Sequence, residues 1–337
     1  MRVLQSVVSC GKLFPVSGAA ECRQVGSPAP GTESFNQPFE ELSMRTNQSD
    51  VDLLRRVMVR RPEDAFGSPA VVQESWRALG YHGAPDIEAA KAEHEAFVEI
   101  LQGAGAEVVY LEHDSALGMD SLYTRDASVI CSDGAILCQM GKQARAAEPR
   151  AQGEVFENLG IPVFGAIEGD GRLEGGDVAW LDDRTLVAGL GYRTNSAGIE
   201  QLRDLLADRI DELIVVQLPH WRGPRDVFHL MSMFSPLDHS VALVYSPLLP
   251  VPFRNTLLER GYELVEVPDD EFDSMGCNAL ALRPGQCVLV EGNTVTRGRI
   301  ESAGIEVIEY TGVEISTRGS GGPTCLTRPL ERLPPGK

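Results

Sequence analysis

The sequence predicts an α/β fold in which five similar units pack around an axis and close a ring. One pattern recurs along the chain: two strand-like runs joined by a short turn, then a helix, then a further strand, a ββαβ unit. The copies begin about 50 residues apart, a spacing typical of repeated supersecondary units. The last copy lacks its own helix, and elements near the start of the folded region supply the missing parts.

The elements nearest the start of the folded region belong to the unit that both ends of the chain form together. Residues 1–43 are rich in Ser, Gly and Pro and carry no apolar period, so we expect a disordered lead followed by a single catalytic domain over 44–337. A strand at 57–59, a helix over 86–102 and a strand at 107–110 follow from their apolar patterns. The two ends of the folded chain then meet in one unit.

The clearest complete unit lies in the middle of the chain. Its strands are expected at 177–181 and 185–188, its helix at 197–206 and its last strand at 213–216. The other hairpins begin near Ser121, Asp226, Gly276 and Gly322. The period alone also fits a doubly wound sheet, but that fold alternates single strands with helices, and no GxGxxG follows a strand here. We therefore reject a dinucleotide-binding fold.

The segment before the first long helix is expected to be a loop. It spans residues 61–83, and its Gly67, Pro69 and Gly80 predict a mobile lid that closes over a site.

Composition excludes several classes of function. Forty-nine acidic and 30 basic residues give a formal charge of −19, which repels nucleic acid and anionic membranes and suits a small cationic substrate. No run approaches the roughly 18 apolar residues of a membrane span. The seven cysteines are an odd number without framework spacing, which favours reduced thiols and a cytoplasmic location.

Two residues stand out as candidates for nucleophilic chemistry. Cys325 follows the Gly-rich run 319–324, where bare backbone lets a substrate approach closely, and it begins an apolar strand pattern. His229 lies in the strand-like run 226–231, in which alternation puts it on the same face as Met231. An inert buried thiol and a core histidine are the simpler alternatives. No HExxH and no clustered Cys/His spacing indicates a metal.

Acidic motifs open two other hairpins. They are Asp120-Ser121-Leu122-Tyr123-Thr124-Arg125-Asp126 and Glu174-Gly175-Gly176-Asp177. Either motif alone is an ordinary turn sequence. Equivalent ends of successive units converge on the axis, so acid, His and Cys at matching positions in four units indicate a catalytic site there.

With these residues, the chain resembles the guanidino-group-modifying enzymes, the superfamily of arginine deiminases, dimethylargininases and amidinotransferases, and is most similar to its dimethylargininase-like members. The resemblance covers residues 52–330 and rests on five ordered motifs: 120–126, 174–177, 192–195 (Tyr-Arg-Thr-Asn), 228–230 (Phe-His-Leu) and 321–325 (Gly-Gly-Pro-Thr-Cys). It implies a five-bladed α/β propeller (pentein) with a central active site, and a cysteine hydrolase that needs no metal or cofactor.

The resemblance also implies a role for each catalytic residue. Cys325 would attack the guanidinium carbon and form a covalent thiouronium intermediate, and His229 would protonate the departing amine and then activate water. Glu174 would hold and charge His229. Asp126 would accept hydrogen bonds from the guanidinium.

The amino-acid end of the substrate is assigned by the same resemblance. Arg145 and Arg193 would clamp the carboxylate with bidentate forks. Asp120 would bind the α-amino group, and Tyr123 would line the pocket.

The chain departs from the superfamily pattern at two positions. Met231 stands where deiminases and amidinotransferases carry a second carboxylate, which leaves room for an N-alkyl group and favours N-methylated arginine, converted to citrulline and an alkylamine. Arg125 stands where dimethylargininases tend to have an acid. Arginine deiminase, amidinotransferase and a catalytically retired guanidine-binding protein remain as alternatives. A homodimer is the default expectation for the assembly.

Overall fold

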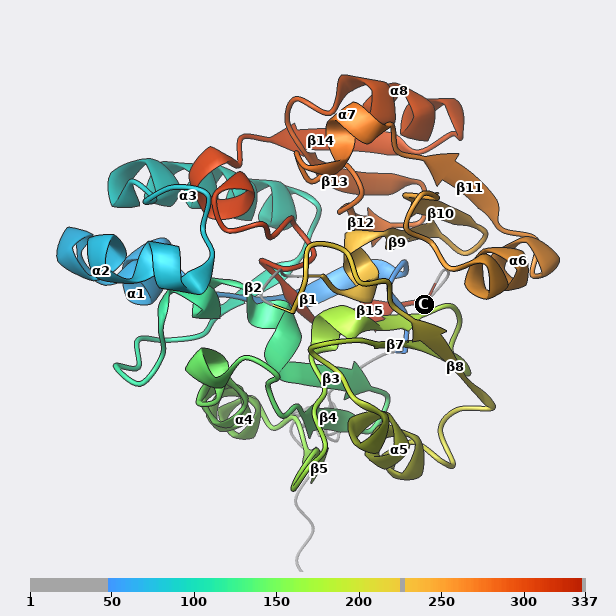
Figure 1. Ribbon diagram of the computed structural model, residues 1–337, viewed down its shortest axis with the longest axis horizontal. Helices are drawn as coiled ribbons and strands as arrows, with labels where there is room; N and C mark the ends of the chain where they lie inside the picture. The colour runs from blue at the N-terminus through green and yellow to red at the C-terminus, as the bar shows by residue number, and fades with distance from the viewer. Residues whose placement is uncertain (1–47, 225–227, 335–337) are drawn as a thin grey trace, which may run out of the picture. The chain divides into compact units, whose positions relative to one another are not determined.

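The computed structural model describes residues 48–224 and 228–334, and the predicted lead over 1–43 lies outside them. These described residues form five three-stranded sheets with the helices that accompany them (Figure 1). None of the helices in these two ranges combines the length and the apolar character that crossing a membrane requires.

Four of the sheets confirm the predicted ββαβ unit. In each, the first strand pairs antiparallel with the second, and the second pairs parallel with the third across a helix, because parallel neighbours need a crossover connection. The units are β3 (Ser128–Cys131), β4 (Gly134–Leu137), α4 (Glu148–Asn158) and β5 (Val163–Ala166); β6 (Val178–Trp180), β7 (Thr185–Leu190), α5 (Ser196–Leu205) and β8 (Glu212–Gln217); β9 (Phe234–Asp238), β10 (Val241–Val244), α6 (Val251–Glu259) and β11 (Glu263–Glu266); and β12 (Leu280–Arg283), β13 (Gln286–Val290), α8 (Thr294–Ser302) and β14 (Glu306–Tyr310). A short helix α7 (Asp269–Phe272) precedes the last of these units.

The fifth sheet joins the two ends of the described chain, as predicted. Its central strand β1 (Leu53–Val59) pairs antiparallel with β15 (Arg328–Leu333) and parallel with β2 (Glu107–Tyr110). The crossover from β1 to β2 contains α3 (Ile87–Gly103), whose start is capped by Asp86, which accepts a hydrogen bond from the Ala89 N–H at 2.8 Å.

The prediction of a mobile loop over residues 61–83 is wrong. Two helices occupy it, α1 (Pro62–Phe66) and α2 (Pro69–Leu79). Each begins with a proline in its first turn, where the missing N–H costs nothing, and Ser68 caps α2 by accepting from Val71. Pro69 therefore starts a helix where we expected a flexible loop.

Side chains tie each sheet to the next by hydrogen bonds to backbone carbonyls. The contacts are Arg328 Nη1 to Ser128 O (2.7 Å), Trp180 Nε1 to Ile130 O (3.2 Å), Tyr262 Oη to Leu181 O (3.0 Å), Ser235 Oγ to Cys277 O (2.9 Å) and Arg332 Nη2 to Ala281 O (2.9 Å). Buried donors need such partners, so these bonds fix how neighbouring sheets meet.

The segment before the first strand of several sheets is a tight turn. Short 3-10 turns precede β3 (η1, Met119–Leu122, and η2, Thr124–Ala127), β6 (η4, Gly175–Asp177) and β9 (η5, Leu230–Ser232). The predicted strand over 226–231 is therefore wrong, because His229 caps η5 and the strand begins at Phe234; residues 226 and 227 lie outside the described residues. These turns carry the site residues.

Candidate active site

Each sheet contributes polar side chains from the turn before its first strand. Asp126 precedes β3, Glu174 and Asp177 precede β6, His229 precedes β9, Asn278 precedes β12, and Cys325 precedes β15. Four of these turns were expected to carry the chemistry. Asn278 was missed, because a single Asn ahead of an apolar run has no signal that separates it from an ordinary turn residue.

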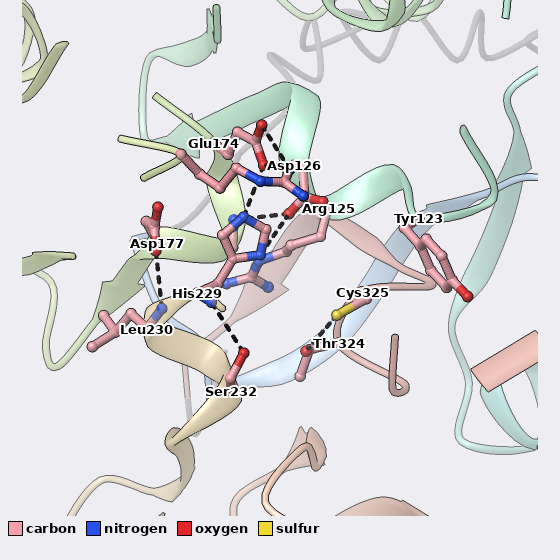
Figure 2. Close-up of polar contacts among 12 residues, drawn as sticks. Tyr123, Arg125, Asp126, Glu174, Asp177, His229, Leu230, Ser232, Thr324 and Cys325 are labelled. Atoms are coloured by element: carbon pink, nitrogen blue, oxygen red, sulfur yellow. Dashed lines mark hydrogen bonds and ion pairs between the residues drawn. The ribbon is translucent and has the colours of Figure 1, made fainter. Parts of the chain in front are cut away.

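His229 is paired with a fully buried carboxylate. Its Nε2 donates to Glu174 Oε2 at 2.8 Å (Figure 2), and Arg193 Nη1 donates to the same oxygen at 2.8 Å. The other oxygen, Oε1, accepts from the backbone N–H of Gly141 at 2.9 Å and of Lys142 at 3.2 Å. Burial alone raises the pKa of Glu174, but the hydrogen bond from His229 and the charge of Arg193 outweigh it and lower that pKa. The carboxylate is ionised at neutral pH.

The opposite nitrogen of His229 faces a second carboxylate. Its Nδ1 lies 3.8 Å from Asp126 Oδ1, and Asp177 Oδ1 accepts from the Leu230 N–H at 2.9 Å. Burial would lower the pKa of His229, but the charges of Asp126 and Asp177 and the bond to Glu174 raise it to about 9. His229 is therefore protonated at neutral pH and suited to act as a general acid.

Two glycines allow these side chains to approach one another. A Cβ on Gly176 would lie 2.6 Å from His229 Nδ1 and 2.7 Å from Asp126 Oδ1, so any larger residue would separate them. A Cβ on Gly322 would collide with the side chain of Asn278. The glycines of both Gly-Gly motifs thus make room for neighbouring site residues.

Cys325 lies among polar groups but is a neutral thiol in this state. Asn278 Nδ2 donates to its Sγ at 3.5 Å, and Thr324 Oγ1 lies 3.9 Å from it (Figure 2). Asn278 Oδ1 also accepts from the Thr324 N–H at 3.0 Å, which fixes the turn that holds the thiol. Burial and the charge of Asp126 raise the pKa of Cys325 to about 11. Some positive charge is needed to generate the thiolate.

Seven of the eight predicted site residues line one small pocket of about 50 Å³, which we call the polar pocket. They are Asp120, Tyr123, Asp126, Arg145, Arg193, His229 and Cys325. The eighth, Glu174, has no exposed surface and contacts His229 without lining the pocket. The turns therefore bring together residues that are up to about 200 positions apart in the sequence.

Arg145 is held by neighbouring side chains. Its Nε and Nη2 donate to the two oxygens of Glu148 at 2.9 and 2.7 Å, Nη2 donates to Tyr123 O at 2.8 Å, and Nη1 pairs with Asp126. Burial raises the pKa of Glu148 to about 7 even though Arg145 lowers it. Glu148 was not predicted from the sequence, because it has the pattern of an ordinary acidic residue in the first turn of a helix. In the same pocket Lys142 Nζ lies 2.5 Å from Asp120 Oδ2.

Arg125 points away from the polar pocket. Its Nη2 donates to Asp50 Oδ1 at 2.7 Å, and Asp50 Oδ2 accepts from the Trp180 N–H at 2.7 Å. Both side chains are buried. Arg125 therefore stabilises the junction between sheets, and its difference from the dimethylargininase pattern does not alter the lining of the site.

The ligand atoms of Asp126, Glu174 and His229 lie within 4.8 Å of one another, a spacing that could hold a metal ion. Two of these groups already form a hydrogen bond with each other, because His229 Nε2 donates to Glu174. The same geometry serves an acid–base pair beside a carboxylate that binds a cation.

Comparison with known proteins assigns this arrangement to a family. A family model described as "N,N dimethylarginine dimethylhydrolase, eukaryotic" matches residues 71–332. The chain belongs to this family. It is thereby a member of the guanidino-group-modifying superfamily expected from the sequence.

Two known proteins align with much of the chain. The uncharacterised protein YkgA of Bacillus subtilis is 29% identical over 246 residues, which cover 73% of this chain and 82% of YkgA. An arginine deiminase of Listeria welshimeri is 27% identical over 257 residues, 62% of this chain and 61% of the deiminase.

Solved structures share the fold at low identity. A dimethylarginine dimethylaminohydrolase of Pseudomonas aeruginosa in complex with citrulline aligns with a TM-score of 0.67 at 23% identity, covering 83% of this chain and all of that one. The amidinotransferase SxtG of Microseira wollei aligns with a TM-score of 0.69 at 17% identity, covering 86% of this chain and 97% of SxtG. At these identities the likeness concerns the fold.

Proposed function

We propose that the protein is a cysteine-dependent hydrolase of the guanidino group of N-methylated arginine, which releases citrulline and an alkylamine. The observation that carries the proposal is the position of His229, bonded to Glu174 and facing Asp126, in a pocket that also contains Cys325. An acid, a nucleophile and a carboxylate that binds a cation are the groups that such a reaction requires.

The substrate itself supplies the charge that activates the thiol. A guanidinium cation bound to Asp126 compensates the negative charge that helps to raise the pKa of Cys325 and adds positive charge beside it. The thiol then loses its proton to solvent, and the thiolate attacks the guanidinium carbon. Activation therefore accompanies binding of a cationic substrate.

The proton balance closes over two steps. In the first, the C–N bond to the substituted nitrogen breaks as His229 donates its proton to that nitrogen, which leaves as a neutral amine. In the second, neutral His229 takes a proton from water, and the hydroxide attacks the thiouronium carbon. The C–S bond of this adduct then breaks, and the departing thiolate takes up the hydroxyl proton, which restores the thiol and gives neutral citrulline. Glu174 stabilises the charged imidazole in both steps.

The amino-acid end of the substrate would enter the polar pocket, where Arg193 and Arg145 would bind the carboxylate and Asp120 the amino group. All three line that pocket, and Tyr123 forms part of its wall. Arg145 would release Asp126 and bind the substrate carboxylate with its Nη1. Its Nη2 would stay bonded to Glu148.

We also propose that the five sheets close into a five-bladed propeller within one catalytic domain over residues 44–337. The pairing of β1 with β15 and the hydrogen bonds between successive sheets support the closure. A cytoplasmic location is proposed from the seven cysteines without framework spacing.

The choice of N-methylated arginine rests on Met231. Its side chain is 2% exposed and lines the cavity beside Cys325 and His229, where it offers an apolar surface to an N-alkyl group. Arginine deiminase is the second candidate, favoured by the 27% identity to the Listeria welshimeri enzyme.

A citrulline assay of the purified protein tests both candidates. The substrates are dimethylarginine, monomethylarginine, arginine and agmatine, the last followed through its own product, N-carbamoylputrescine, with the Cys325→Ala variant as the control. Preference for the methylated compounds supports the proposal. Preference for arginine would make the protein a deiminase, and absence of citrulline from every arginine substrate would refute hydrolysis.

A further inference from the structure

A second cavity opens on Cys325 and His229. It has a volume of about 420 Å³, against about 50 Å³ for the polar pocket, and the two share His82, His229, Ser320 and Cys325. We call it the apolar cavity. Sites that hold whole drug-sized ligands measure roughly 300–1,000 Å³, so this volume far exceeds the needs of one or two methyl groups.

One wall of the apolar cavity is hydrocarbon and sulfur, whereas Ser232, Asn278 and Thr317 add polar groups elsewhere in its lining. Its lining includes Phe228, Met231, Phe272, Met275 and Cys277. Met231 and Cys277 are 2% and 1% exposed, so this face continues into the protein core. Such a surface binds an apolar group by removing it from water.

Besides His229, which is bonded to Glu174, the charged groups that line the apolar cavity form one ion pair. Arg222 Nη2 donates to both oxygens of Asp273 at 2.8 and 2.7 Å. Trp221 lies beside this pair and packs edge-on against Phe272 with ring centroids 6.1 Å apart. This ion pair therefore offers no unpaired charge to a substrate carboxylate.

Two strained residues support the same wall. Met275 and Ser320 are the non-glycine residues with positive φ among those that the structure describes, at 68° and 58°, and both line the apolar cavity. Residues other than glycine rarely adopt a positive φ. Such a backbone conformation persists at positions that the surrounding structure holds in place. The cavity is thus a defined feature of the folded chain.

The two pockets divide the substrate between them. The polar pocket carries Asp120, Lys142 and Arg193, which suit the charged amino-acid end. Because Cys325 and His229 border both pockets, the departing nitrogen and its substituent face the apolar cavity when the amino-acid end occupies the polar pocket.

We propose that the site also accepts, and prefers to methyl, a larger hydrocarbon group on the departing nitrogen, so that the substrate class widens from N-methylated arginine to N-alkyl and N-aralkyl arginine. The inference rests on the proposed function and extends it to the substituent. One water is consumed, the C–N bond to the substituted nitrogen breaks, and the products are citrulline and the larger alkylamine or aralkylamine.

A substrate series tests the inference on the purified full chain. Formation of citrulline is measured for N-methyl-, N-propyl- and N-benzylarginine. We expect kcat/KM to rise at least about tenfold from the methyl to a larger substituent, the gain typical of added hydrocarbon in a hydrophobic pocket. Equal or falling values across the series would overturn the inference while leaving the proposed function intact. Citrulline from none of the three would overturn both.

Matched variants at one position assign the effect to the apolar cavity. Met231→Trp fills it, whereas Met231→Leu conserves the volume. The ratio of kcat/KM for benzyl to methyl substrate should fall at least about tenfold in the tryptophan variant and stay within about threefold of wild type in the leucine variant. An unchanged ratio in a folded tryptophan variant, judged by near-ultraviolet circular dichroism, would contradict the inference. If that variant does not fold, the wild-type series decides.

Discussion

Two clusters of buried charge among the described residues differ in their access to solvent: one opens on a pocket, and the other does not. The site cluster comprises Asp126, Glu174 and His229, and the structural cluster comprises Asp50, Arg125, Arg328 and Arg332. All seven side chains are buried. Asp126 and His229 line the polar pocket, whereas no member of the structural cluster lines that pocket or the apolar cavity.

The two clusters also differ in what their charges contact. In the structural cluster the arginines donate to backbone carbonyls, as Arg332 does to Ala281 O at 2.9 Å. The charges of Arg125 and Arg332 outweigh burial and keep the pKa of Asp50 low, and burial lowers the pKa of Arg332 only to about 10. In the site cluster His229 titrates near pH 9. Access to a pocket, together with an imidazole whose pKa is raised, distinguishes the site cluster from the structural cluster.

Loss of the thiol is the largest expected effect. Cys325→Ala should lower kcat about 10⁴-fold or more, because the variant lacks the thiol that would form the covalent intermediate. Thermal unfolding should change little, since Cys325 is partly exposed. The control is Cys287→Ala, whose thiol is fully buried in β13 and lines neither site pocket, and it should retain activity. Comparable activity in both variants would refute Cys325 as the nucleophile.

Removal of the imidazole should come next. His229→Asn is expected to lower kcat by about 10²- to 10⁴-fold, the usual contribution of a general acid and base. His94→Asn is the matched control, because burial lowers the pKa of His94 to about 4 and this residue lines neither pocket. Steady-state kinetics that show equal losses in the two variants would remove the distinction between a catalytic and a core histidine.

The structural cluster should respond in stability instead of activity. Asp50→Asn removes the partner of Arg125 and leaves a buried charge uncompensated, which costs about 3–5 kcal/mol of unfolding free energy. Urea unfolding measures this loss, and turnover per folded molecule should stay near the wild-type value. A loss of turnover without a loss of stability would place the cluster in the catalytic machinery.

The pH dependence of unfolding free energy should give the smallest of these effects, and it also separates the two clusters. The pKa of His229 in the folded protein, about 9, exceeds the ordinary value of 6.5, so its contribution to stability is complete below about pH 6.5 and is lost as the pH rises through 9. That contribution amounts to about 3 kcal/mol at most. Unfolding at a series of pH values should show this decline in the wild type and lose it in His229→Asn, and kcat should fall over the same range. Identical pH profiles of stability in the wild type and in His229→Asn would contradict the assigned pKa of His229.

Much of the fold was predictable because hairpin and helix patterns have a clear periodicity. The pairing of β1 with β15 followed from a unit without a helix at one end of the chain and a surplus of elements at the other. The 3-10 turns were not predictable, since a turn such as 230–232 has the composition of a strand and depends on tertiary contacts, here Leu230 N–H to Asp177.

The gathering of the candidate site residues at one pocket was predictable from the sequence, and their contacts were less so. Cys325, His229 and the acids occupy matching places in their units, which the sequence displays. Glu148 and Asn278 gain their importance only from partners at other positions, Arg145 and the thiol. Such pairings require the folded structure, because no spacing in the sequence encodes them.

Capture of the covalent intermediate tests the central claim most directly. The protein is mixed with monomethylarginine, quenched in acid during turnover, and digested for mass spectrometry. The expected result is a mass gain on the peptide that contains Cys325, equal to the substrate without its departing amine, and no gain in Cys325→Ala. Steady citrulline formation without such an adduct, or with an adduct on another residue, would contradict the assignment of Cys325 as the nucleophile.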